Sequence, residues 1–452
     1  MKPLNMEKAE SAAGDTSGSG SVDTLSAPPI DKKKARKTLT AAVIGTTVEY
    51  YDFGIYGYMA TMLGAHFFVA DNAYAAQLGV FATFAVAFFL RLPGGIFFGH
   101  MGDKYGRKKA LTWTIFLMVA ATFLMGALPT YATLGLWATL TLVMVRCLQG
   151  FAAGGEISGA NAFVVETAPR HKRATYTSPV NSGSYIGSLL AALVALGLNQ
   201  TFDSQQILEW AWRLPFLISL PLGVVGLWIR NRLSDTNEFK RMQAEGEQAK
   251  VPLAELLRTS KAPIGKMILM GAQITGGYYV ASVFAATFIQ TTAGHSPTTA
   301  FTSTSIAMVL GSITLPLAGR AADKFGRKKV IFTGSISGLI LGYPMFMLML
   351  APQWFMPVIA QSILFICVSI VNGASFTAYA EMLKSQVRFS GIALANNTSN
   401  MLLGGTAPFI ATFLIQATGM SVAPAFYWIF CTILTIIGTS LIKETKGIEL
   451  PT

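Results

Sequence analysis

The chain has 452 residues, of which 52% are apolar and 12% charged, and its mean hydropathy is +0.50. Soluble domains carry about 25% charged residues, so this composition excludes a water-soluble globule and requires a surface that faces lipid. A formal net charge of +12 would indicate nucleic acid in a soluble protein. Here the basic residues lie in short loops between apolar runs, which argues against a nucleic-acid partner.

The chain begins with a segment, residues 1–38, that lacks the apolar core and cleavage site of a signal peptide. Its first 31 residues are rich in Ser, Gly, Ala, Asp and Pro, and a basic run then precedes the first apolar stretch. We predict a disordered, basic cytosolic tail. The three cysteines all lie in apolar segments and imply no disulfide framework.

Apolar stretches long enough to form membrane helices follow this tail. Crossing about 30 Å of hydrocarbon takes about 20 apolar residues. We therefore predict an all-α membrane protein with twelve transmembrane helices. The twelve stretches are residues 41–66, 77–99, 109–128, 134–165, 174–198, 213–230, 263–290, 298–318, 330–350, 353–380, 390–416 and 422–442.

The distribution of Lys and Arg predicts the orientation of these helices. Of the 34 basic residues, 31 lie in the two termini and in the loops that share a side with them. The other three, Arg91, Arg146 and Arg213, lie inside or at the edge of helices. By the positive-inside rule both termini are cytosolic. We expect a multi-pass protein of the cell inner membrane.

An internal repeat divides the chain. Residues 99–109 read GHMGDKYGRKK, and residues 319–329, at an offset of 220, read GRAADKFGRKK. Each copy joins the second and third helices of a six-helix half. Two parallel halves related by a pseudo-two-fold axis along the membrane normal suit alternating access. The predicted parts are the tail 1–38, a six-helix bundle 39–230, a cytosolic linker 231–262, a second six-helix bundle 263–445 and a cytosolic tail 446–452.

Further motifs accompany the two loops. They are Glu49-Tyr50-Tyr51-Asp52-Phe53, Arg91 before Gly94-Gly95, Arg146-x-x-Gln149-Gly150, Gly154-Gly155-Glu156, Trp212-Arg213-Leu214-Pro215-Phe216 and Arg388-Phe389-Ser390-Gly391. Over residues 40–445 the chain resembles the major facilitator superfamily, and within it the metabolite:proton symporter branch, which includes carriers of proline/betaine, citrate, α-ketoglutarate and shikimate. One departure is that Leu92 separates Arg91 from Pro93, where members of this branch usually have Arg-Pro.

Charged residues inside the membrane are confined to the first half. Each costs at least about 2.5–3.5 kcal/mol near the bilayer centre, so each needs a partner or a function. They are Glu49, Asp52, Arg91, Arg146 and Glu156. The repeat places neutral residues where four of these would recur, at Ala272, Gly311, Ile366 and Phe376. We infer that ion chemistry belongs to the first half.

The three carboxylates are candidates for proton coupling. Asp52 lies one turn deeper than Glu49 and, at i+3, on the same helix face. A partly desolvated carboxyl near an arginine suits proton uptake on one side and release on the other. Asp52 is the first candidate, followed by Glu49 and Glu156. For Glu49 the alternative is a structural salt bridge with Arg91, because both lie about 12 Å from the cytosolic helix ends.

Substrate binding is assigned to arginines and to uncharged polar side chains. Arg146 can bind a carboxylate bidentately, or it can neutralise a buried acid such as Glu156. The aromatic doublets Tyr50-Tyr51 and Tyr278-Tyr279 also allow a box for a quaternary ammonium. The predicted substrate contacts are Arg146, Arg91, Tyr51, Gln273, Tyr278, Tyr279, Asn372 and Asn396.

The repeated loops are interpreted as gating elements. Asp103 and Asp323 can each accept N–H bonds at a helix N-terminus or pair with an arginine. Arg107 and Arg327 belong to the same motif, and Glu166 is placed to meet Arg107. The four histidines show no metal-ligand spacing, and no metal or cofactor is expected.

The favoured function is proton-coupled uptake of a small carboxylate-bearing metabolite by a monomer in lipid, driven by the proton gradient. Exporter branches of the family that the chain resembles carry a Gly-Pro signature in their fifth helix; residues 174–198 lack it, so the resemblance favours uptake over export. A proline/betaine-type carrier is the alternative, and a transporter-like sensor is the alternative of another class. No nucleophile–base set is present, so an enzyme is not expected.

Overall fold

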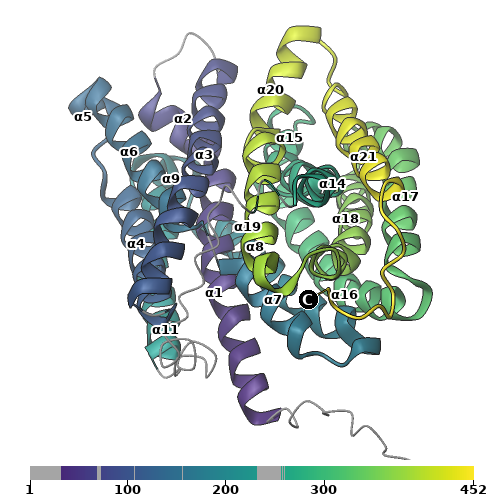
Figure 1. Ribbon diagram of the computed structural model, residues 1–452. Coiled ribbons are helices and arrows are strands. Elements are labelled where there is room, and N and C mark those ends of the chain that lie inside the picture. The colour runs from purple at the N-terminus through teal and green to yellow at the C-terminus, as the bar shows by residue number, and fades with distance from the viewer. Residues whose placement is uncertain are drawn as a thin grey trace, which may run out of the picture.

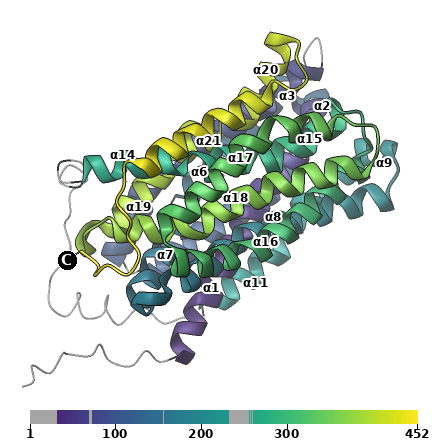
Figure 2. The ribbon, with the colours of Figure 1, turned by 90° about the vertical axis from the view of Figure 1, so that its right-hand side faces the viewer.

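The computed structural model describes residues 32–68, 73–105, 107–154, 156–231, 256, 258 and 260–451. Every regular element in this part is a helix, and most run roughly parallel from one end of the molecule to the other (Figures 1 and 2). The predicted tail 1–38 and linker 231–262 lie largely outside the described residues.

The helices fall into two halves of the chain. The first half comprises α1 Lys32–Tyr58, α2 Ala60–Phe67, α3 Ala73–Tyr105, α4 Arg107–Ala127, α5 Tyr131–Leu134, α6 Leu136–Ala152, α7 Glu156–Thr167, α8 Arg173–Thr201, α9 Ser204–Glu209, α10 Leu214–Leu217 and α11 Ser219–Asn231. The second half comprises α14 Lys261–Ala272, α15 Ala285–Thr291, α16 Pro297–Phe325, α17 Arg327–Met349, α18 Phe355–Glu381, α19 Ser385–Ser399, α20 Ala407–Thr418 and α21 Pro424–Ser440.

Eight helical stretches among the described residues are long and apolar enough to cross a membrane. Three shorter apolar helices accompany them, at Thr112–Ala127, Leu136–Ala152 and Pro424–Ser440. The all-α, multi-pass class is therefore as predicted. The eight stretches are Tyr74–Phe98, Arg170–Thr201, Ala211–Trp228, Lys261–Thr291, Pro297–Phe325, Arg327–Met349, Phe355–Glu381 and Val387–Thr418.

Several predicted helices are interrupted. The stretch 134–165 forms two helices, because α6 ends at Ala152 and α7 begins at Glu156. Between them, a Cβ on Gly154 would lie 2.3 Å from the backbone nitrogen of Gly95 and 2.5 Å from the carbonyl oxygen of Arg91. Residue 154 is a glycine because α3 passes directly against the backbone at this point and leaves no space for a side chain.

Wide π-helical turns interrupt two helices of the second half. Gln273–Gly277 and Val280–Phe284 separate α14 from α15, and Asn400–Gly404 lies between α19 and α20. Such turns change the direction in which following side chains point, and they are frequent at functional sites.

Helix α8 connects the halves. It packs along α1 in the first half and along α16 in the second, and Figure 2 shows α8 and α16 side by side. The approach is close enough that a Cβ on Gly319 would lie 2.2 Å from Ser178 Oγ and 2.6 Å from the carbonyl oxygen of Ala174. Gly319 opens the second copy of the repeat, so this contact gives a physical reason for glycine there.

The molecule has two ends, which we name by their residues. The basic end contains the α7–α8 and α16–α17 connections and the residues that follow α21, and it lies at the bottom of Figure 1. The opposite end contains α2, α5 and the connections α15–α16 and α20–α21.

Candidate functional site

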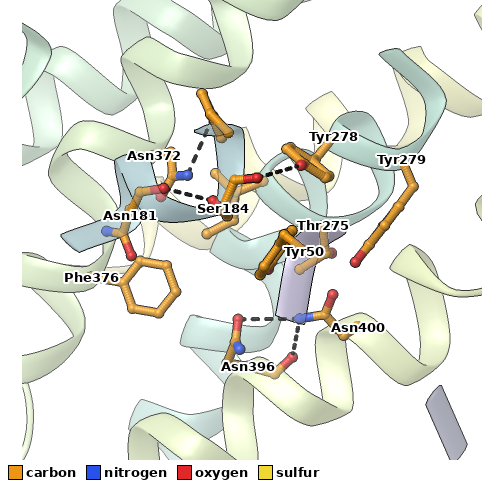
Figure 3. A pocket seen from close by; sticks show the side chains of 12 residues that line it. Tyr50, Asn181, Ser184, Thr275, Tyr278, Tyr279, Asn372, Phe376, Asn396 and Asn400 are labelled. Atoms are coloured by element: carbon orange, nitrogen blue, oxygen red, sulfur yellow. Dashed lines mark hydrogen bonds between the residues drawn. The ribbon is translucent and has the colours of Figure 1, made fainter. Parts of the chain in front are cut away.

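A small cavity lies between the two halves and has room for about one water molecule in its present shape (Figure 3). Aromatic rings, amides and hydroxyls make up most of its lining. From the first half come Tyr50, Asn181, Ser184 and Tyr185, and from the second half Ile274, Thr275, Tyr278, Tyr279, Asn372, Phe376, Asn396 and Asn400.

Beside the cavity, Tyr278 of the second half contacts several residues of the first half. Its hydroxyl lies 2.6 Å from Ser188 Oγ. Its ring packs against Tyr185 and Tyr50, with centroids 5.5 and 5.8 Å apart. A second polar contact runs from Asn372 Nδ2 to the Tyr185 hydroxyl at 3.3 Å. The cavity is thus walled on both sides by tyrosines that touch across the interface.

Three polar atoms of the cavity have no hydrogen-bond partner within the described part of the chain. They are Asn181 Nδ2, Asn372 Oδ1 and the Tyr279 hydroxyl. A buried polar atom without a partner costs about 1–3 kcal/mol. These atoms are therefore suited to a ligand that offers both an acceptor and a donor, or to water.

Four of the eight predicted substrate contacts lie in the lining of this cavity, and their contact with substrate stays a prediction. Tyr278, Tyr279, Asn372 and Asn396 line the cavity.

Tyr51 is one correction. Its hydroxyl donates to the carbonyl of Pro215 at 2.7 Å, inside the first half, whereas its neighbour Tyr50 lines the cavity. Consecutive residues of a regular helix point about 100° apart, so Tyr51 points into the first half while Tyr50 faces the cavity.

Gln273 is a second correction. It is fully buried within the second half, where its side chain reaches Gly338 near Trp428. Its backbone nitrogen donates to Thr435 Oγ1 at 2.9 Å. Neither polar atom of its side chain has a partner among the described residues. Gln273 opens the first π-helical turn, which directs it away from the cavity.

The predicted arginines also lie outside the cavity lining. Arg91 forms a buried salt bridge with Glu49, as the structural alternative expected. Its guanidinium also stacks on Phe53, 4.8 Å from the ring centroid, and on Phe88 at 5.1 Å. This leaves Arg91 occupied within the first half.

Arg146 lies deeper in the same half and is fully buried. Its guanidinium sits 3.9 Å from the centroid of Tyr56 and donates to Gln149 Oε1. Gln149 in turn donates to Thr122 Oγ1 at 2.6 Å. Arg146 is thus held behind the cavity wall rather than in the lining.

Asp52 completes this buried cluster. Neither carboxylate oxygen accepts a hydrogen bond from the described residues, and Thr122 and Arg146 are the groups close enough to act on it electrostatically. An unpaired buried carboxylate is costly as an anion, so this group is suited to exchange between a protonated form and an ion paired with arginine. The side chain of Glu156, the third proton candidate, lies outside the described residues.

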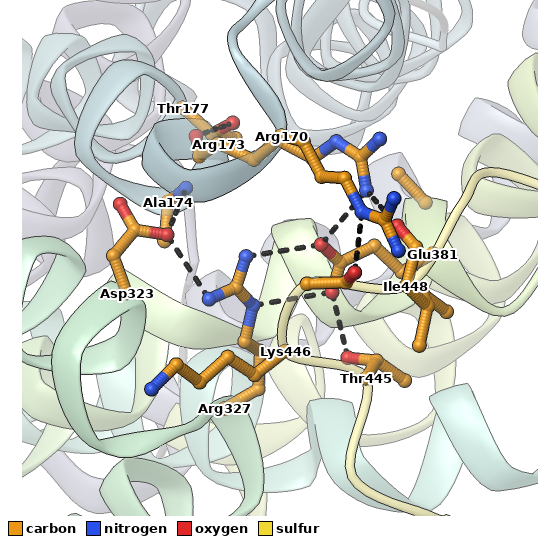
Figure 4. Close-up of polar contacts among 12 residues, drawn as sticks. Arg170, Arg173, Ala174, Thr177, Asp323, Arg327, Glu381, Thr445, Lys446 and Ile448 are labelled. Atoms are coloured by element: carbon orange, nitrogen blue, oxygen red, sulfur yellow. Dashed lines mark hydrogen bonds and ion pairs between the residues drawn. The ribbon is translucent and has the colours of Figure 1, made fainter.

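A network at the basic end joins the halves (Figure 4). Asp323 accepts the N–H groups of Ala174 at 3.2 Å and Thr175 at 2.8 Å, at the N-terminus of α8, and pairs with Arg327 at 3.0 Å. Both geometries predicted for Asp323 are therefore present together. Arg327 also donates two bonds to Glu381, at 3.0 and 3.1 Å.

Glu166 pairs with Arg388 of α19, across the two halves, at 2.7 Å. Its predicted contact with Arg107 stays a prediction. The side chains of Asp103 and Arg107 lie outside the described residues. The pair of Glu166 with Arg388 thus joins the halves at the basic end, and farther along α19 Asn397 donates to the carbonyl of Gly154 at 2.7 Å.

At the opposite end the observed contacts between the halves are apolar. Tyr58 meets Phe301 edge-on with centroids 6.1 Å apart, and Gly57 faces the side chain of Val283. The molecule is therefore closed at the basic end by ions and hydrogen bonds and at the opposite end by packing.

Three cavity residues on α8 were not predicted, although the sequence carries a signal for them. Asn181, Ser184, Tyr185 and Ser188 follow the spacing i, i+3, i+4, i+7, which marks a single polar helix face. Glycines at 183 and 187 occupy another face, which packs on the backbone of α1. Within the described part, no group of three or more His, Cys, Asp or Glu side chains could hold a metal.

A sequence model of the Major Facilitator Superfamily matches residues 42–408. The proline/betaine transporter of Salmonella typhimurium (strain LT2) is 33% identical over 432 residues, which cover 92% of this chain and 85% of that protein. The putative proline/betaine transporter of Staphylococcus aureus (strain COL) is 34% identical over 430 residues, covering 93% and 91%.

Solved structures with a similar fold include the xylose transporter XylE from E. coli. In its partially occluded inward open conformation it gives a TM-score of 0.72 at 18% identity, over 92% of this chain and 100% of that one. The proton:xylose symporter XylE bound to 6-bromo-6-deoxy-D-glucose gives 0.74 at 17% identity, over 92% and 98%.

Proposed function

The chain belongs to the Major Facilitator Superfamily and is a multi-pass membrane transporter rather than an enzyme, and from that premise we propose that it imports a small zwitterion together with protons. The substrate class joins an ammonium centre to a carboxylate, as in proline and betaine. We further propose twelve helices in two six-helix bundles, with the basic end and both termini on the cytosolic side of the inner membrane.

The observation that carries this proposal is the uncharged lining of the cavity. Within the described part, its polar groups are tyrosines, amides and hydroxyls. Tyrosine faces attract quaternary ammonium groups, and amide N–H and phenol groups can bind a carboxylate. A substrate with net negative charge would need a cation in the lining, whereas a zwitterion does not. The proline/betaine transporters named above support the same class.

The uncharged lining narrows the proposed substrate from any small carboxylate-bearing metabolite to a zwitterion. Arg91 and Arg146 lie behind the wall, near enough to act electrostatically on Tyr279. They bias the cavity toward a carboxylate without contacting it. An organic acid remains the second candidate because of these two cations.

Proton coupling is assigned to Asp52 and Arg146. When Asp52 is protonated, its attraction to Arg146 falls, and the first half can change its packing behind Tyr279. When Asp52 loses the proton on the cytosolic side, the ion pair forms again. Alternating access then opens the basic end and the opposite end in turn, with the substrate held between the halves.

Transport assays with purified protein in proteoliposomes test the substrate class. With an alkaline interior, we expect accumulation of radiolabelled glycine betaine or proline, and weak competition by citrate, α-ketoglutarate and shikimate. Accumulation of an organic acid with no competition by betaine would assign the second candidate instead. Absence of counterflow for every compound that binds would favour a sensor.

A pair of adjacent tyrosines provides a matched control. Tyr50→Leu should raise the half-saturating betaine concentration roughly tenfold, because it removes one aromatic face worth about 1 kcal/mol or more. Tyr51→Phe, one residue away and outside the cavity, should leave that concentration unchanged. Equal effects at both positions would contradict the cavity as the binding site.

A further inference from the structure

The residues that follow α21 cross the basic end as an extended segment, which we call the strap and define as residues 444–451. Its first residues are bound to the second half. Glu444 accepts the N–H groups of Arg327 and Lys328 at 2.8 and 3.1 Å. Thr445 Oγ1 donates to the buried carboxylate of Glu381 at 2.6 Å.

The far end of the strap returns to the same half. The carbonyl of Pro451 accepts the N–H of Ser385 at 3.0 Å and a guanidinium N–H of Arg388 at 3.1 Å. Between these anchors the chain turns at Gly447, whose φ of 70° lies in the left-handed region that favours glycine. The strap is therefore an arch with both feet on the second half.

The middle of the arch contacts the first half. Arg170 donates to the carbonyl of Gly447 and reaches Glu449 at 3.2 Å. Arg173 donates to the carbonyl of Ile448 at 2.9 Å and, beneath the strap, reaches Glu381 at 3.4 Å (Figure 4). Two guanidinium groups next to the N-terminus of α8 are thus held by the strap. Hydrogen bonds with a charged donor are about twice as strong as neutral ones.

We propose that the strap is a latch that moves with the second half and holds the basic end closed through Arg170 and Arg173. The inference rests on the alternating access proposed above. When the basic end opens, α8 separates from α16, and both arginines must leave the carbonyls of the arch. The strap thereby slows opening on the cytosolic side, in addition to the contacts that Asp323 and Glu381 make.

The first experiment measures opening directly. A variant without native cysteines carries Ser178→Cys, because Ser178 is buried against Gly319 only while α8 and α16 touch. A membrane-impermeant maleimide applied to the basic side reports exposure of this cysteine. Truncation after Lys446 removes the arch but keeps Glu444 and Thr445. We expect it to raise the labelling rate roughly three- to tenfold, and Arg170→Gln to raise it less.

The result separates this inference from the function on which it rests. If substrate does not alter labelling of the untruncated protein, alternating access fails as proposed. If substrate alters labelling but truncation does not, the strap is no latch. A rise on truncation, with substrate response retained, supports the inference.

Cross-linking gives a test that does not depend on folding of a truncated chain. A disulfide between Arg170→Cys and Glu449→Cys ties the arch to the first half, and transport should stop until a reductant is added. The control joins Ser385→Cys to Pro451→Cys, which ties the strap to its own half, and transport should continue. Arrest by both cross-links, or by neither, would overturn the proposal.

Discussion

At mid-depth the first half buries charged side chains, whereas the buried polar side chains described at corresponding depth in the second half are uncharged amides and hydroxyls. Glu49 and Arg91 form a salt bridge, and Asp52 lies beside Arg146. The residues 220 positions later than Asp52, Arg91 and Arg146 are Ala272, Gly311 and Ile366. The same helix arrangement therefore accommodates charged side chains in one half and neutral residues at the corresponding positions of the other.

In the second half, Gly311 occupies the position that corresponds to Arg91. A Cβ on Gly311 would lie 2.5 Å from the ring of Phe365 and 2.9 Å from Ser369 Oγ. Helices α16 and α18 thus approach too closely for a larger side chain. Because close packing suffices there, stability alone does not explain the ions of the first half.

At the basic end the comparison is reversed. The second half buries the carboxylate of Glu381 between Arg327 and Arg173. The residue 220 positions earlier is Asn161, which donates to Asn181 Oδ1 at 2.9 Å. We infer a division of labour, with the central ions of the first half for coupling and Glu381 of the second half, which pairs with Arg173 of the first, for closing the basic end.

The largest effect is expected at Asp52. Asp52→Asn should abolish accumulation against a gradient, because the amide cannot carry a proton, while substrate exchange continues. Uptake by the unaltered protein should rise as external pH falls, and uptake by the variant should not. Proteoliposomes with and without a pH gradient measure both. A variant that still concentrates substrate would show that Asp52 is not the proton carrier, and Glu49→Gln would be tested next; coupling retained in both variants would break the assignment to these two acids of the first half.

The next effect is expected at Glu381. Glu381→Gln removes the buried carboxylate that Arg327 and Arg173 share. The guanidinium of Arg327 is then left with Asp323 alone among the described carboxylates. Breaking a buried pair costs about 3–5 kcal/mol. We expect a clear fall in the thermal unfolding temperature of the purified protein. Glu166→Gln is the matched control, because its carboxylate is 36% exposed and such pairs contribute about 1 kcal/mol or less. Equal losses in both variants would show that burial does not set the contribution of these ions.

The structure agrees with sequence-based prediction where local chemistry decides. Asp323 was placed correctly because the repeat locates it at a helix connection, where N–H groups and an arginine are the available partners. The pair of Glu166 with Arg388 was not predicted, because Arg388 belongs to the other half and pairs between halves depend on which end is closed.

Four of the five substrate contacts predicted in the second half line the cavity, whereas none of the three predicted in the first half does. Side-chain directions follow the 3.6-residue period only in a regular helix. Along α8 that period holds, so the polar face containing Ser184 and Tyr185 could have been found. Around Tyr278 two π-helical turns break the period, and Gln273 faces Trp428 instead.

A smaller effect is expected at Arg146. Lysine keeps the charge near Asp52 but loses the stack on Tyr56 and the fork that binds Gln149. Arg146→Lys should lower the maximal uptake rate roughly tenfold, equivalent to about 1.4 kcal/mol, and leave the half-saturating concentration nearly constant. The measurement is transport kinetics, which give the maximal uptake rate and the half-saturating concentration separately. A tenfold rise in the half-saturating concentration at constant maximal rate would place the guanidinium in contact with substrate.

The smallest effect, and opposite in sign, is expected at Gln273. Its amide is buried in the second half with no partner among the described residues for either polar atom. Methionine has a similar length and no strong hydrogen-bonding group, so Gln273→Met should remove a penalty of about 1–3 kcal/mol. We expect the unfolding temperature to rise by a few degrees and the half-saturating concentration to stay constant. Asn372→Leu is the matched comparison, since Asn372 lines the cavity, and it should weaken substrate binding. If Gln273→Met instead weakens binding, the amide reaches the substrate in another conformation, and the second half contributes more to recognition than the cavity indicates.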